Sequence, residues 1–174
     1  MIKAQSVAVG DILSYLAADG KYKAIICTSV RKETSPHLFE FALTTYDSVL
    51  KPTLENILSS EFYGVVSLRN EYFPYSESEV EEMWLIHPEI IPNIIGSYSL
   101  IIWKKDLKQF ESSLEMVGNV SIVTNVDRNG NGSVNASSWD FLRKSTPQLM
   151  ENMSFRGQKI YQIKAIVKHR RRNI

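Results

Sequence analysis

An Asp19-Gly20 pair between two apolar runs is the feature that most constrains the fold of this chain. The first run covers residues 12–16, after Gly10-Asp11, and the second covers residues 22–30. Asp-Gly in this setting is typical of a β-hairpin, because glycine readily adopts the positive φ that tight turns require. Residues 37–45 largely alternate apolar and polar side chains and predict a third strand. The chain is therefore expected to start an antiparallel sheet.

The remaining pattern mixes strands with short helices and shows neither a βαβ rhythm nor a repeat. Further strands are expected at residues 62–68, 97–103, 119–125 and 159–168. Short helices are expected at residues 52–60, after an N-cap at Ser78, at 107–116 and at 133–145. Pro88 and Pro92 prevent a long helix over residues 85–95. The predicted fold class is α+β, with a curved antiparallel sheet or small barrel and short helical insertions.

Length and composition predict one globular domain over residues 1–174, with a short basic tail at residues 168–174. Cys27 is the only cysteine, so neither an intrachain disulfide nor a cysteine-based zinc site is expected. The first residues lack the pattern of a secretory signal, and no apolar run reaches the roughly 20 residues of a membrane helix. A cytoplasmic protein that does not bind a membrane is therefore expected, and the sequence carries no signal for an oligomeric state.

The charges are distributed unevenly although the formal net charge is only +1. Residues 53–103 contain eight acidic residues and one basic residue, Arg69. After Glu151 the chain has seven basic residues and no acidic one. The two regions either attract each other within the fold or present one acidic and one basic surface. The basic residues at the end of the chain are explained by a solvated tail. Nucleic acid is therefore not expected as a partner.

The segment that begins at Asp127 resembles the first half of a calcium-binding EF-hand loop. Side-chain oxygens stand at its first, third and fifth positions, and a glycine stands at the sixth. The twelfth position, however, is Ser138 where a bidentate glutamate is needed, and residues 118–126 are β-branched rather than helical. We predict a surface turn between a strand at 119–125 and a helix around Trp139, with no calcium or other metal bound.

The sequence shows no recognisable catalytic constellation. Cys27 lies in an alternating apolar strand and is interpreted as a buried core residue rather than as a nucleophile. None of the three histidines can be tied to a nucleophile, and the phosphate-binding, dinucleotide-binding and nucleophile-elbow motifs are absent from the sequence. No catalytic residue and no cofactor is therefore predicted.

Several short motifs resemble immunity proteins of bacterial polymorphic-toxin systems. They are Gly10-Asp11, Asp19-Gly20-Lys21-Tyr22, Phe62-Tyr63-Gly64, Trp84-Leu85-Ile86 and Ile95-Gly96-Ser97. The resemblance covers about two-thirds of the chain and has no counterpart after Met116. It implies a small cytoplasmic α+β protein that binds and blocks a toxin and catalyses nothing.

The sequence thus favours a non-enzymatic binding protein whose partner is a protein, a basic toxin being one example. The expected contact surface is the acidic set Glu71, Glu77, Glu79, Glu81, Glu82 and Glu89, because charge complementarity speeds association. Carboxylates at the start of a helix are also favoured by the helix dipole alone. The alternative is a small-ligand-binding protein or enzyme with an aromatic pocket lined by Tyr72, Phe73, Tyr75 and Trp84.

Overall fold

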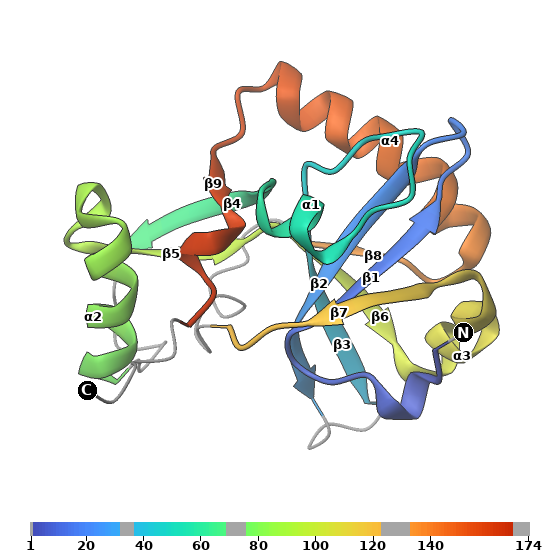
Figure 1. Cartoon of the computed structure of the whole chain (residues 1–174), viewed down its shortest axis with the longest axis horizontal. Helices are drawn as coiled ribbons and strands as arrows, with labels where there is room; N and C mark the ends of the chain where they lie inside the picture. The colour runs from blue at the N-terminus through green and yellow to red at the C-terminus, as the bar shows by residue number, and fades with distance from the viewer. Residues whose placement is uncertain (1, 32–36, 69–75, 123–132, 169–174) are drawn as a thin grey trace.

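The computed structural model describes residues 2–31, 37–68, 76–122 and 133–168, as two β-sheets with short helices (Figure 1). The strands are β1 Asp11–Leu16, β2 Tyr22–Arg31, β3 Leu38–Leu43, β4 Glu61–Leu68, β5 Asn93–Ser97, β6 Ser99–Trp103, β7 Glu115–Asn119, β8 Ser133–Asn135 and β9 Ile160–Gln162. The α-helices are α1 Leu54–Leu58, α2 Glu77–Ile86, α3 Lys104–Phe110 and α4 Trp139–Phe155. Single 3₁₀ turns occur at Ala4–Ser6, Pro88–Ile90, Glu111–Ser113 and Ile163–Ala165.

The larger sheet has six strands in the order β7-β1-β2-β3-β6-β8. Its neighbours are antiparallel except for β6 and β8, which are parallel. β1 and β2 form the predicted hairpin, in which Leu16 pairs with Tyr22 and Gly20 has φ 78°. The prediction of three N-terminal antiparallel strands is therefore confirmed.

The smaller sheet has three antiparallel strands in the order β5-β4-β9. A single residue, Tyr98, separates β5 of this sheet from β6 of the larger one. The Tyr98 N–H donates to the carbonyl of Tyr63 in β4, at 2.8 Å. The Tyr98 carbonyl accepts from the N–H of Leu43 in β3, at 3.1 Å. One residue is thus hydrogen-bonded to a strand of each sheet.

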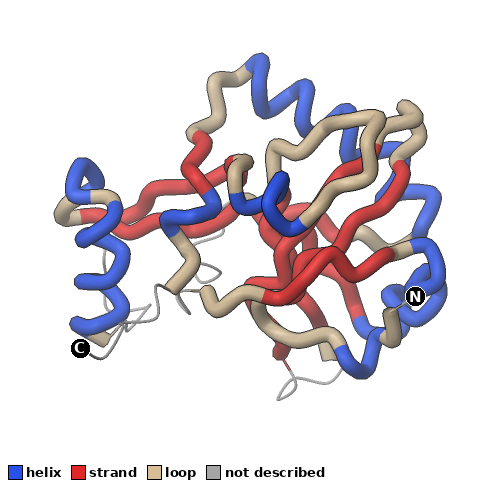
Figure 2. Tube along the Cα trace, in the orientation of Figure 1, coloured by secondary structure: helices blue, strands red, loops and turns tan. Residues whose placement is uncertain are grey.

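Apolar side chains cover both faces of the larger sheet. One core packs Leu13, Ile25 and Phe41 against α3, α4 and the N-terminal segment. The other core extends from Ile12, Ile26 and Ala42 to residues of α1, the smaller sheet and α2. Because successive strand residues point to opposite faces and both faces are covered, most positions of β1 and β2 are buried. Figure 2 shows α2 beside the smaller sheet, at the end of the molecule opposite α3.

The predicted α+β class with a curved, antiparallel-rich sheet is confirmed. Of the two forms expected, the open sheet is found rather than a small barrel, since the described strands do not close on themselves.

The predicted helix at 133–145 is wrong in its bounds. Residues 133–135 form β8, and α4 continues to Phe155 with Pro147 inside it. Proline lacks the N–H that would bond the carbonyl of Arg143, four residues earlier. That carbonyl instead accepts a 2.9 Å hydrogen bond from the N–H of Ala18 in the β1–β2 turn. A distant donor thus compensates for the proline, and the helix extends past it.

Three other predicted elements differ from the structure. The segment 107–116 is not one helix, since α3 ends at Phe110 and β7 begins at Glu115. Asn93–Ser97 forms a strand that was not predicted, and the strand expected at 159–168 is shortened to β9. Of the strand expected at 119–125, Asn119 ends β7 and Ile122 makes an isolated bridge with Val167. Residues 123–125 lie outside the described residues.

Candidate functional site

The acidic helix α2 begins two residues earlier than the sequence suggests. Its N-cap is Ser76 rather than Ser78, and the Ser76 hydroxyl accepts a 3.3 Å hydrogen bond from the N–H of Glu79. The Glu79 carboxylate in turn accepts from the N–H of Ser76 at 3.0 Å. This reciprocal capping box satisfies two backbone donors at the helix end and so fixes where the helix starts.

The predicted acidic contact residues that the structure describes lie on α2 and just after it. Glu77, Glu81, Glu82 and Glu89 are exposed, and Glu79 is half-buried. Glu71 lies outside the described residues. Leu85 is 84% exposed. It lies four residues after Glu81 and three residues after Glu82, so it adjoins both on the helix surface. The outer face of α2, defined here as Glu77, Glu81, Glu82 and Leu85, therefore combines carboxylates with one exposed apolar side chain.

Two contacts link these acidic residues to basic side chains of the chain itself. Lys168 Nζ lies 3.9 Å from a carboxylate oxygen of Glu82, so one residue of the basic C-terminal region contacts the acidic helix. His87 Nδ1 lies 2.5 Å from Glu89 Oε1. Hydrogen bonds from its own backbone and from His87 hold the pKa of Glu89 below its usual range. The acidic and basic regions of the sequence thus meet at one described point.

The structure describes one of the four aromatic residues predicted to line a pocket. Trp84 is half-buried against the second core, and its indole N–H donates to the carbonyl of Asn93 at 2.7 Å. Tyr72, Phe73 and Tyr75 lie outside the described residues. The aromatic pocket therefore stays a prediction.

Only the last part of the loop that resembles an EF-hand is described, because residues 123–132 lie outside the described residues. At its twelfth position, Ser138 is the N-cap of α4, and its hydroxyl accepts from the N–H of Phe141 at 3.2 Å. A hydroxyl that caps a helix in this way is oriented towards the helix rather than towards a loop centre. The prediction that the loop binds no calcium remains to be tested.

The predicted burial of Cys27 is confirmed, because its exposed fraction is 0%. Its thiol lies 3.6 Å from the carbonyl oxygen of Ser29, inside the larger sheet.

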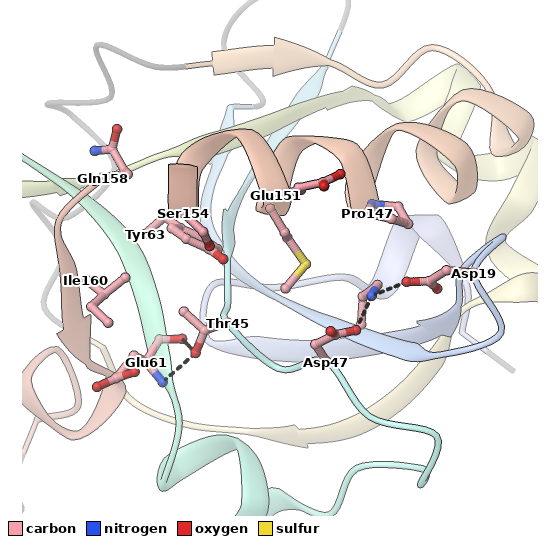
Figure 3. A pocket seen from close by; sticks show the side chains of 12 residues that line it. Asp19, Thr45, Asp47, Glu61, Tyr63, Pro147, Glu151, Ser154, Gln158 and Ile160 are labelled. Carbon is pink, nitrogen blue, oxygen red and sulfur yellow. Dashed lines mark hydrogen bonds and ion pairs between the residues drawn. The ribbon is translucent and has the colours of Figure 1, made fainter. Parts of the chain in front are cut away.

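A cleft of about 540 Å³ lies between α4 and the strands that face it (Figure 3). Its first wall comes from the N-terminal part of the chain and consists of Asp19, Lys23, Thr45, Asp47, Glu61 and Tyr63. Its second wall comes from α4 and the segment after it and consists of Pro147, Met150, Glu151, Ser154, Gln158 and Ile160. Residues from opposite ends of the sequence thus form one site.

A buried lysine closes one end of this cleft. The Lys23 side chain is only 2% exposed, and its ammonium contacts Asp19 at 2.7 Å and also Asp47. Lys21 Nζ lies 3.0 Å from the other carboxylate oxygen of Asp47. Burial raises the pKa of Asp47, but hydrogen bonds from Lys23 and Lys21 outweigh this effect and hold that pKa below its usual value. These four residues form the Lys23 cluster.

The other charged groups of the cleft are Glu61 and Glu151. Among the described residues neither forms an ion pair with a basic side chain; Glu151 accepts a 3.3 Å hydrogen bond from Gln148. Glu61 is held through its backbone, whose carbonyl accepts from the N–H of Thr45 at 2.8 Å. The lining therefore holds four carboxylates and one ammonium, so the cleft is suited to a cationic group.

Sequence reasoning missed the cleft, although Lys23 gives one signal. It is the only charged residue among the first residues of β2, Tyr22-Lys23-Ala24-Ile25-Ile26-Cys27, which are otherwise apolar. A lysine in a strand that is apolar on both faces must be paired when buried, so acidic partners nearby could have been expected.

Comparisons with family models, with curated proteins and with solved structures found no match to this chain. Within the described ranges, no helix has the length and apolarity needed to cross a bilayer. The same ranges hold no group of three or more histidine, cysteine or acidic side chains arranged to bind a metal ion.

Proposed function

We propose that this chain is a non-enzymatic cytoplasmic protein that binds a basic protein partner through the outer face of α2. The observation that supports this proposal best is Leu85, which is 84% exposed beside the carboxylates of Glu81 and Glu82. An apolar side chain surrounded by polar and charged ones matches the arrangement of protein interfaces, which have an apolar core and a polar rim.

The helix that carries this face is held firmly. Val80 and Met83, on its inner side, are buried in the second core, and the capping box fixes its first turn. A preorganised surface loses little conformational entropy on binding, which favours affinity. Its carboxylates attract a basic partner over a distance of about 8–10 Å at physiological salt and so speed association.

The proposed partner is a toxin, and the proposed role is that of an immunity protein. The support is the resemblance of the hairpin and strand motifs to such proteins, together with the acidic face. Many toxins are basic nucleases, so an acidic surface complements them. Binding alone would block the toxin, and no catalytic residue of this chain is needed.

Affinity capture from the source cells tests the proposal. The wild-type chain is compared with a double charge reversal, E81K/E82K, with L85D, and with E55K as a control on the exposed side of α1. We expect one basic protein to be captured by the wild type and by E55K, and to be lost with both α2 variants. Equal capture by all four chains would show that α2 is not the contact surface.

A growth assay then tests neutralisation. The captured protein is expressed in a heterologous host with the wild-type chain or with E81K/E82K. We expect the wild type to restore growth and the double variant to fail, although both accumulate to the same level. A captured protein that is harmless when expressed alone would refute the immunity role.

A further inference from the structure

We propose that the cleft beneath α4 is a second binding surface, which receives the arginine or lysine side chain of a basic polypeptide segment. This cleft is separate from the outer face of α2, and the proposal does not depend on the function proposed above. No described residue belongs to both surfaces.

The size and lining of the cleft suit a long cationic side chain. Its volume of about 540 Å³ falls within the roughly 300–1,000 Å³ typical of ligand sites. Met150, Pro147 and Ile160 provide apolar contacts for an aliphatic stem. Arginine and lysine combine such a stem with a charged end, and they bury the stem while the charge meets polar groups.

The charges indicate where the cation would lie. At one end of the cleft the Lys23 cluster is internally paired, and its ammonium already occupies the space between Asp19 and Asp47. Glu61 and Ile160 lie at the opposite end, and Glu151 lies on α4 between the two ends (Figure 3). A guanidinium that enters between Glu61 and Glu151 can donate to one of these carboxylates and is attracted by the charge of the other. Hydrogen bonds between oppositely charged groups are about twice as strong as those between neutral groups.

The rim of the cleft favours a polypeptide over a small free cation. Phe155 is 92% exposed and lies one helical turn after Glu151, so both side chains project from the same edge of α4. Ile160, which lines the cleft, is itself 46% exposed. A free amino acid within the cleft would leave Phe155 in water, whereas a chain that crosses the rim would cover it. Exposed apolar patches that are rimmed by polar residues mark protein-interaction sites.

The probe for the test is a blocked peptide, acetyl-Ala-Arg-Leu-amide, and the readout is the ¹³C-methyl NMR signal of Met150. Met83, in the core beneath α2, reports on unrelated changes. We expect a saturable shift of the Met150 signal with the arginine peptide and none with the same peptide containing citrulline, which lacks the charge. Added salt should weaken the binding.

Matched variants locate the contacts. E61Q and E151Q should each weaken peptide binding, by roughly tenfold for the carboxylate that accepts a hydrogen bond from the cation. F155S should weaken the peptide and leave the weaker binding of free arginine unchanged. E55Q should have no effect, and E81K/E82K should retain wild-type peptide binding, which separates this proposal from the α2 contact.

Three results would overturn the proposal. One is a Met150 signal that does not move at millimolar arginine peptide. Another is equal binding of the citrulline peptide, which would exclude recognition of charge. The third is binding of free arginine or spermidine as tight as that of the peptide, which would show that the cleft takes small cations rather than a polypeptide.

Discussion

Replacing Lys23 tests which part of this buried side chain stabilises the fold. The Lys23 side chain is only 2% exposed, and its ammonium is paired with Asp19 and Asp47. Lys23→Ala removes both the stem and the charge, whereas Lys23→Met removes the charge and keeps most of the stem. The two variants therefore separate apolar burial from ion pairing.

The structure predicts a large difference between these variants. Alanine removes three methylene groups, at about 0.8 kcal/mol each, and leaves a cavity, so we expect a loss of about 3 kcal/mol. Methionine leaves the two aspartates, which are 31% and 37% exposed and remain solvated. Loss of the ion pairs is then offset by relief from burying an ammonium, and we expect about 1 kcal/mol or less.

Urea denaturation measures both values from the shift of the midpoint at constant slope. A methionine variant as unstable as the alanine variant would refute the reasoning, because ion pairing would then dominate. Conversely, a stability of the alanine variant equal to wild type would show that the stem contributes nothing.

The same pair of variants has a predictable pH dependence. The pKa of Asp47 is lowered in the folded state, so its contribution is fully present above the ordinary value of 3.8 and is lost as pH falls through the lower folded value. Lys23→Met removes part of this contribution. The stability of the wild type should therefore fall more steeply than that of the methionine variant when the pH is lowered below about 4. If the stability of both proteins fell equally with pH, Lys23 could not be a cause of the lowered pKa of Asp47.

Three further predictions concern other parts of the chain. Gly10→Ala should destabilise by more than about 2 kcal/mol in urea denaturation, since Gly10 has φ 89° and an added Cβ would lie 1.8 Å from the carbonyl oxygen of Val120; a stability equal to wild type would contradict this. Cys27 should react with a thiol reagent only as fast as the protein unfolds, because it is fully buried; rapid labelling of the native protein would disprove that. Calorimetric titration should detect no calcium binding tighter than about 0.1 mM, because Ser138 cannot replace a bidentate glutamate.

Elements set by local signals were predictable from the sequence, and those set by distant contacts were not. The Asp19-Gly20 turn carries its own backbone preference, so the first hairpin followed from a few adjacent residues. The length of α4 could not be predicted in this way. Pro147 reads locally as a helix break, and it is accommodated because Ala18, far away in sequence, supplies a donor to Arg143.

The cleft could not be predicted from the sequence for the same reason, because it is formed by residues that are distant in sequence. Its walls come from residues 19–63 and 147–160, and no short motif contains both. Charge composition located the acidic residues of α2, because they are contiguous in sequence. It could not show that Glu61 and Glu151 face one cavity, since that depends on how α4 packs against the sheet.

Tyr98 has a consequence for the way this chain can vary in length. Its backbone is bonded to β4 on one side and β3 on the other, so a residue inserted or deleted here shifts one sheet by a full position against the other. Such a shift turns every inward side chain of a strand outward. Homologous chains should therefore keep this junction at constant length and place their insertions elsewhere.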